Sequence, residues 1–264
     1  MHGLAATDPG RSIDWGRTSN DYALYRPGPP PSFFQRLLEL GVGLPGQRIL
    51  DLGTGTGALA REFARQHAVV AATDVSDGQI EQARRLAQQQ GLAIDFRCAP
   101  AEEAVFPANS FDGATASQCW LYFDAVRVLA ALRAQVRPGG WLLTSHFSWL
   151  PRVDPIARAS EALVLQFNPA WSAADWSGQV PAEPAWARAA DLRVRARFVY
   201  DQPIAFTHDS WRGRMRACRG VAAALPQPQV EAFDRAHARL LRELAPEGRF
   251  AVLHRIDAHL FELG

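Results

Sequence analysis

The sequence contains no lysine, although it is 264 residues long and has 28 basic residues, all of them arginine. A chain without lysine forms no Schiff base and cannot supply the lysine of a phosphate-binding loop. Pyridoxal-phosphate chemistry and standard P-loop NTPase activity are therefore excluded.

Residues that bind metals or form disulfides are also scarce. The three cysteines, Cys98, Cys119 and Cys218, are too few and too widely spaced for a disulfide framework or a C-x-x-C metal site. The histidines form no ligand pattern, and His254 and His259 fall on opposite faces of a predicted strand. We therefore expect no metal cofactor.

Long apolar runs are absent. Residues 1–30 contain nothing that resembles the hydrophobic core of a signal peptide, and no later run approaches the roughly 20 apolar residues that a membrane span requires. Together with the few cysteines, this predicts a cytoplasmic protein without a membrane partner.

An excess of either charge is absent as well. The formal net charge is +1, and no basic tail predicts a nucleic-acid partner. With 48% hydrophobic residues, the chain can bury a large core. A small-molecule substrate is the expected partner, and nothing in the composition indicates an oligomeric state.

Short apolar segments alternate with helical patterns between residues 48 and 147. The predicted strands are 48–52, 69–74, 94–98, 111–117 and 141–147, and such nearly continuous apolar runs are typical of strands buried on both faces. The predicted helices are 59–66, 77–90 and 124–136, and Arg137-Pro-Gly-Gly140 is expected to end the last one. This alternation predicts a doubly wound α/β fold with a mostly parallel sheet.

The regular alternation ends after residue 147. Helices are predicted at 155–166, 209–220 and 229–244, and strands at 193–206 and 249–260. Segment 168–187, which is rich in Trp, Pro and small residues, is expected to be a long ordered loop or a lid. We predict an N-terminal helical segment with the cofactor-binding core in residues 1–150, and substrate-cap helices with the final strand pair in residues 151–264.

A glycine-rich turn, Asp51-Leu-Gly-Thr-Gly-Thr-Gly57, follows the first predicted strand and precedes a helix. Glycines let backbone N–H groups approach a ligand without obstruction by Cβ, and a helix N-terminus favours negative charge. The spacing departs from the dinucleotide pattern G-x-G-x-x-G only at Ala58, which that pattern tolerates. The turn alone therefore indicates a nucleotide-like cofactor without specifying which one.

Asp74 ends the next predicted strand, about 20 residues after the turn, where a carboxylate can accept both ribose hydroxyls of an adenosine. This position fits NAD as well as other adenosine cofactors. The alternative is that Asp74 only caps the helix that begins near Asp77.

Motifs along the chain resemble the type-11 methyltransferase family of class I S-adenosylmethionine-dependent methyltransferases. In chain order they are Ile49-Leu-Asp-Leu-Gly-Thr-Gly-Thr-Gly57, Thr73-Asp-Val-Ser76, Ala101-Glu102, Phe106-Pro107, Asn109-Ser-Phe-Asp112, Gln118-Cys-Trp-Leu-Tyr-Phe-Asp124 and Arg137-Pro-Gly-Gly140. Upstream, Tyr22-Ala-Leu-Tyr-Arg-Pro27 resembles an element of one branch of the family. The resemblance implies a seven-stranded Rossmann-like methyltransferase sheet with an antiparallel last strand and a helical cap inserted in the C-terminal part.

The resemblance also implies the cofactor, S-adenosyl-L-methionine, which leaves as S-adenosyl-L-homocysteine. By this resemblance the methionine part lies against Asp51, Gly53, Gly55 and Gln118, its carboxylate near Tyr22 and Arg26, the ribose against Asp74, and the adenosine against Val75, Gln79, Ala101 and Glu102. Two positions depart from the family pattern. Pro100 stands where relatives often have an Asp that contacts adenine, and Leu121 stands where they often have a His.

His146 is the candidate general base because it lies near the end of the fifth predicted strand, where open α/β sheets place their ligands. The ordinary pKa of a histidine suits proton removal near neutrality. The alternative is a histidine that satisfies a buried hydrogen bond or orients a loop.

Aromatic residues and one arginine cluster are the candidates for binding the substrate. Eight tryptophans are many for this length, and Trp149, Trp171, Trp176, Trp186 and Trp211 fall outside the nucleotide-binding half. We predict a pocket for a flat or apolar molecule that includes Trp120, Tyr122, Trp149 and Trp211, with lid packing as the alternative. Arg212, Arg216 and Arg219 share a predicted helix face, with Arg212 as a candidate clamp for an anion and a solvated or acid-paired face as the alternative.

The sequence therefore predicts an enzyme that methylates an O or N atom of a small molecule. Such a transfer does not require a strong catalytic residue, because positioning of the reactants alone lowers the barrier. The first rival is a protein of the same fold that binds the cofactor without methylating. The second is an NAD(P)-dependent oxidoreductase, disfavoured because a Tyr-x-x-x-Lys dyad needs a lysine. Nucleic-acid methylation is disfavoured by the charge, and protein substrates stay open.

Overall fold

The computed structural model describes residues 21, 24–25 and 28–263. Two of the predicted cofactor-binding residues, Tyr22 and Arg26, lie outside the described residues.

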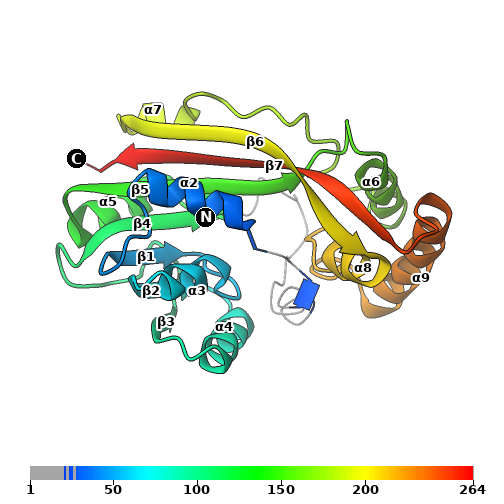
Figure 1. Ribbon diagram of the computed structural model, residues 1–264, viewed down its shortest axis with the longest axis horizontal. Coiled ribbons are helices and arrows are strands. Elements are labelled where there is room, and N and C mark those ends of the chain that lie inside the picture. Colours follow the sequence, from blue (N-terminus) through cyan, green and yellow to red (C-terminus); the bar gives the residue numbers. More distant parts are fainter. Residues whose placement is uncertain (1–20, 22–23, 26–27, 264) are drawn as a thin grey trace.

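A seven-stranded sheet forms the centre of the molecule (Figure 1). Its strands are β1 (Arg48–Leu52), β2 (Val69–Asp74), β3 (Ile94–Cys98), β4 (Phe111–Ser117), β5 (Val136–Trp149), β6 (Val194–Thr207) and β7 (Arg249–Glu262). Their order is β3-β2-β1-β4-β5-β7-β6, and β7 runs antiparallel to both of its neighbours while the first five strands pair in parallel. The predicted mostly parallel sheet with an antiparallel last strand is confirmed.

Helices cover both faces of the sheet. The apolar sides of α2 (Pro31–Glu39), α3 (Ala58–Arg65) and α4 (Asp77–Gln89) pack on one face, and those of α5 (Ala125–Gln135) and α7 (Ala185–Ala189) on the other. Apolar side chains at helical spacing, such as Leu59, Ala60 and Phe63 of α3, explain this arrangement.

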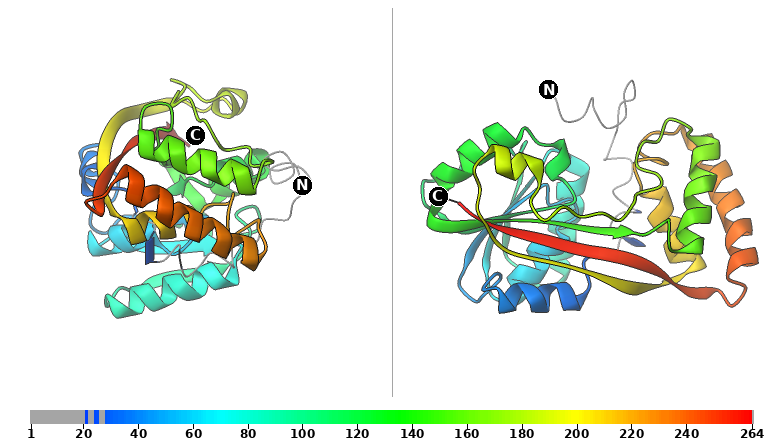
Figure 2. Two further views of the ribbon diagram at one scale, coloured as in Figure 1. Left: turned by 90° about the vertical axis from the view of Figure 1, so that its right-hand side faces the viewer. Right: turned by 90° about the horizontal axis from the view of Figure 1, so that it is seen from above.

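The three C-terminal strands extend beyond the other four strands of the sheet. The helical cap packs at their extended ends, as the right-hand view of Figure 2 shows. Each of β5, β6 and β7 is 14 residues long. The cap helices are α6 (Pro155–Phe167), between β5 and β6, and α8 (His208–Arg216) and α9 (Gln227–Leu244), between β6 and β7. Their core includes Trp211, Phe233 and Leu241, packed against Phe206 of β6 and Val252 of β7.

Two predicted boundaries differ from the structure by more than two residues. Strand β5 begins at Val136 instead of residue 141, so that residues 137–140 belong to it. Helix α5 ends at Gln135, directly before β5, and Gly139, at a φ of +73°, lets the strand bend where its pairing with β4 shifts. Helix α8 ends at Arg216, four residues before the predicted end, and the chain turns so that Gly220 packs against the ring of Trp171.

Segment 168–184 contains neither helix nor strand, yet it is held by arginine side chains on several elements. Arg255 donates to the Gly178 carbonyl at 2.6 Å and Arg197 to the Val180 carbonyl at 3.1 Å, while Arg152 pairs with Asp175 at 2.7 Å. The segment is therefore an ordered loop, one of the two alternatives expected from its composition. Among the described residues, no helix is long and apolar enough to cross a membrane.

Candidate active site

The glycine-rich turn connects β1 to α3 and needs glycine for steric reasons. Gly53, Gly55 and Gly57 have φ values of +59°, +56° and +78°, which other residues rarely adopt. A Cβ on Gly53 would lie 2.8 Å from Sγ of Cys119. The turn thus presents bare backbone at the start of α3, as a cofactor cradle requires.

Asp51, at the end of β1, is buried beneath this turn. Its two carboxylate oxygens accept hydrogen bonds of 2.6 Å from the hydroxyls of Thr54 and Thr115. Burial raises the pKa of Asp51 to about 6, against the lowering effect of these two bonds. The group lines a small pocket together with Gly28, Gly53 and Gln118.

Asp74, at the end of β2, is fixed by the turn itself. Its carboxylate accepts from the backbone N–H of Gly55 at 2.8 Å and of Ser76 at 2.9 Å. Burial raises the pKa of Asp74, and both bonds oppose that rise. Ser76, not Asp74, is the N-cap of α4. Asp74 is therefore not the capping residue of α4, and its carboxylate lies beside the glycine-rich turn.

A cavity of about 1220 Å³ joins the cradle to the cap along the carboxyl ends of the parallel strands. The predicted site residues that line it are Gly53, Gly55, Asp74, Val75, Gln79, Ala101, Glu102, Gln118, Trp120, Tyr122, His146 and Trp149. Residues from four of the sequence motifs thus meet at one cavity. In the described part of the chain, no group of three His, Cys, Asp or Glu side chains could hold a metal ion.

Gln118 ties β4 to β5 beside the cavity. Its φ of +62° is unusual for a residue with a side chain, and such backbone outliers gather at functional sites. The Gln118 backbone N–H donates to the Ser145 carbonyl at 2.8 Å, and its side-chain Nε2 donates to the Phe147 carbonyl at 2.7 Å. These two bonds hold β5 on either side of His146.

Glu102 and Ala101 lie at the opposite end of the cavity, with Pro100 also in the lining. Ala101 is buried, and one Glu102 oxygen accepts from the backbone N–H of Asp124 at 2.8 Å. Glu102 therefore anchors the start of α5 while its carboxyl group borders the cavity.

His146 lies on the sheet face that forms one wall of the cavity, and its Nδ1 is 3.2 Å from Oδ1 of Asp257 on β7. No local sequence signal predicts Asp257, because its partner is 111 residues away and only the β5–β7 register brings them together. Two cap arginines of the lining, Arg214 and Arg219, were likewise not predicted as cavity residues.

Trp211 does not line the cavity but is a core residue, contrary to the prediction. It is fully buried between α8 and the long strands, with its ring against Phe206 and Trp149. Its Nε1–H donates to the Ser160 hydroxyl at 2.9 Å. The prediction that Trp211 contacts substrate is therefore wrong in position, whereas Trp149, Trp171, Trp176 and Trp186 do line the cavity.

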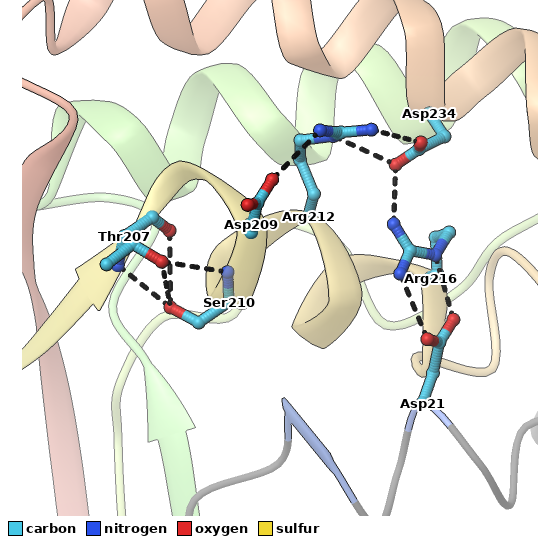
Figure 3. A network of polar contacts seen from close by, with 7 residues as sticks. All are labelled: Asp21, Thr207, Asp209, Ser210, Arg212, Arg216 and Asp234. Carbon is cyan, nitrogen blue, oxygen red and sulfur yellow. Dashed lines mark hydrogen bonds and ion pairs between the residues drawn. The ribbon is translucent and has the colours of Figure 1, made fainter.

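Arg212 also lies away from the cavity, in a network of ion pairs (Figure 3). Its guanidinium pairs with Asp234 of α9 and with Asp209, 3.2 Å away. Arg216 of the same helix face bridges Asp234, at 2.7 Å, to Asp21, at 2.8 Å. The acid-paired alternative thus describes Arg212, which joins α8 to α9 instead of clamping a substrate.

Replacing Arg212 by glutamine is expected to lower the free energy of unfolding by about 1 kcal/mol, since the ion pair is partly exposed. The KM for substrate should stay within twofold of the unmodified protein. Denaturant unfolding and steady-state kinetics measure both quantities. A large rise in KM at unchanged stability would instead support the hypothesis that Arg212 binds an anionic substrate.

Comparison with known proteins agrees with this geometry. Residues 49–140 match a family model described as a methyltransferase domain. The chain is 34% identical over 125 residues to a ubiquinone biosynthesis O-methyltransferase of Dinoroseobacter shibae, covering 47% of this chain and 50% of that protein. It is 33% identical over 133 residues to a ubiquinone/menaquinone biosynthesis C-methyltransferase of Vibrio campbellii, again covering 47% of this chain and 50% of that protein.

The chain thus spans half the length of each of these two relatives. Among solved structures, a protein of Anaeromyxobacter dehalogenans assigned provisionally as a type II methyltransferase superposes with a TM-score of 0.61 at 24% identity, covering 90% of this chain and 98% of that one. This likeness shows a shared fold. Residues 49–140 thus resemble a class I S-adenosylmethionine-dependent methyltransferase domain, and the sheet order described above agrees with that likeness.

Proposed function

We propose that this protein transfers a methyl group from S-adenosyl-L-methionine to an oxygen or nitrogen atom of a small molecule. The observation that carries the proposal is the continuous cavity, which has the glycine cradle and Asp74 at one end and His146 with aromatic side chains at the other. Donor and acceptor can therefore meet within one cavity, and their positioning is the main requirement of an in-line displacement.

The residues present fit the adenosyl cofactor. Asp74 is an acceptor held in place by Gly55, the glycines of the cradle carry no side chains, and Val75, Gln79 and Ala101 offer an apolar and amide lining for the adenosine. The bound cofactor supplies an activated methyl group on a sulfonium. Asp51 and Gln118 border the methionine end of the same site.

The cap supplies the substrate side. Aromatic rings from loop 168–184, from β5, from α7 and from the β4–α5 connection line one cavity, which suits a flat or apolar molecule. Loop 168–184 and cap residues such as Glu161 and Arg214 complete the lining of this side.

The pKa of Asp51 predicts how cofactor affinity depends on pH. The carboxyl is protonated below about pH 6, and the cofactor's ammonium group favours the ionised form. Affinity should therefore rise with pH through 6 and be about tenfold weaker at pH 5 than at pH 7.5. Calorimetric titration with S-adenosyl-L-homocysteine tests this. The Asp51→Asn variant should bind weakly at both pH values, whereas a pH-independent affinity in the unmodified protein would contradict the assignment.

Incubation with methyl-labelled S-adenosyl-L-methionine and a panel of hydroxyl- and amine-bearing aromatic compounds tests the proposed activity. We expect label in at least one compound and stoichiometric S-adenosyl-L-homocysteine. Cofactor binding without transfer to any compound would favour the rival function, a protein of this fold that binds the cofactor without methylating.

A further inference from the structure

The register between β5 and β7 places four polar side chains on one sheet face. His146 is directly opposite Asp257, and Thr144 is opposite His259, in an antiparallel ladder. Residues that face each other across such a ladder project to the same side of the sheet. His146, Asp257 and His259 all line the cavity described above.

Asp257 orients the imidazole of His146. The carboxylate side chain is 2% exposed, the His146 side chain is 40% exposed, and Nδ1 lies 3.2 Å from Oδ1. Because an ionised carboxylate only accepts, the proton of a neutral His146 sits on Nδ1. The lone pair is then on Nε2, on the side of the ring away from Asp257.

His259 does not compete for the same carboxylate. Its Nε2 lies 2.9 Å from the Pro181 carbonyl, which can only accept, so Nε2 carries the proton. Burial lowers the pKa of His259 and keeps the ring neutral. Its Nδ1 is then unprotonated, and at 3.9 Å from Oδ1 of Asp257 it makes no hydrogen bond. Asp257 is thus directed at His146.

The dyad of His146 and Asp257 lies between the residues that border the glycine cradle and those that border the cap. Gln118, which borders the small pocket beside Asp51, is hydrogen-bonded to the two neighbours of His146, Ser145 and Phe147. Trp149 follows on the same strand and begins the aromatic side of the cavity.

We propose that His146, held by Asp257 as a positioning residue, removes the proton of a weakly acidic hydroxyl on a ring system, so that the methyl acceptor is a phenol-type oxygen. This inference rests on the proposed function and narrows it. A neutral amine already offers its lone pair and a carboxylate is already ionised, whereas a phenol with a pKa near that of tyrosine, about 10, is protonated at neutral pH. A positioned base therefore helps the hydroxyl most, typically by 10²–10⁴-fold.

The atoms balance as follows. The O–H bond breaks and its proton moves to Nε2 of His146, while the O–CH₃ bond forms and the S–CH₃ bond breaks with its electron pair left on sulfur. The resulting imidazolium is stabilised by the Asp257 carboxylate and returns its proton to water.

Two phenols of different acidity test the proposal. At pH 8, 4-nitrophenol is largely ionised and 4-methylphenol is protonated. The His146→Gln variant should lose about 100-fold or more in kcat with 4-methylphenol, and Asp257→Asn about tenfold, whereas both should stay within threefold with 4-nitrophenol. The control Asp201→Asn removes a carboxylate that pairs with Arg255 between β6 and β7, and it should change neither rate. Equal losses with both phenols, or transfer to 4-methylaniline but to neither phenol, would overturn the proposal.

The tautomer of His146 gives a readout that needs no activity. NMR of ¹⁵N-labelled protein at pH 8 measures this tautomer, and the His146 signal is identified by its loss in His146→Gln. In the unmodified protein this signal should show the proton on Nδ1, and in Asp257→Asn it should show a mixture of tautomers. A proton on Nε2 in the unmodified protein would overturn the dyad. Absence of transfer to any acceptor, with the Nδ1 tautomer observed, would instead count against the proposed function.

Discussion

The Asp74→Asn variant is expected to bind S-adenosyl-L-homocysteine about 100-fold more weakly than the unmodified protein. The carboxylate is held by the N–H groups of Gly55 and Ser76, so that it faces the ligand without reorganisation. Two hydrogen bonds from ribose hydroxyls to a charged group are worth about 3 kcal/mol in total at the lower end of their range, which corresponds to the stated factor. Isothermal titration calorimetry measures the change.

The matched control is Asp77→Asn, three residues further along and exposed in the first turn of α4. It makes the same change of charge near the same strand end and should alter the affinity by less than threefold. Equal affinities of Asp74→Asn and the unmodified protein would show that the ribose is held elsewhere.

The Trp211→Ala variant is expected to lose about 3–5 kcal/mol of unfolding free energy. The side chain is fully buried in the core of the cap, so that its removal leaves a large cavity among α6, α8 and the long strands. The Trp211→Phe variant keeps most of the packing and should lose only about 1–2 kcal/mol, chiefly through the lost bond to Ser160. Urea unfolding followed by circular dichroism measures both losses.

The half-buried Trp176 in loop 168–184 is the matched control for Trp211. Its replacement by alanine should cost clearly less stability, because the ring is partly solvated. A loss below about 1 kcal/mol for Trp211→Ala would contradict the assignment of Trp211 to the core.

The nucleotide-binding half was predictable because its signals are local. Strands β1, β2 and β4 follow from nearly continuous apolar runs, whereas β3 is a more polar edge strand. The glycine turn follows from steric need at Gly53. The family resemblance then pointed to Asp74 and Glu102, which lie at one cavity in the structure.

The cap side was less predictable because its contacts depend on long-range register. Nothing local to His146 shows that Asp257 lies opposite, since three cap helices, α7 and the β6 strand separate them along the chain. Helical spacing likewise puts Arg212 and Arg219 on related faces, but only tertiary packing decides that Arg212 meets Asp234 whereas Arg219 borders the cavity. Tryptophan content also does not distinguish a core ring such as Trp211 from a cavity ring such as Trp149.

The most direct measurement is a calorimetric comparison of S-adenosyl-L-methionine with NADH on the unmodified protein, because the glycine turn and Asp74 are compatible in type with both cofactors. We predict that S-adenosyl-L-methionine and S-adenosyl-L-homocysteine bind at one site per chain and that NADH does not bind. Binding of NADH, without binding of S-adenosyl-L-methionine, would contradict the assignment of the cavity.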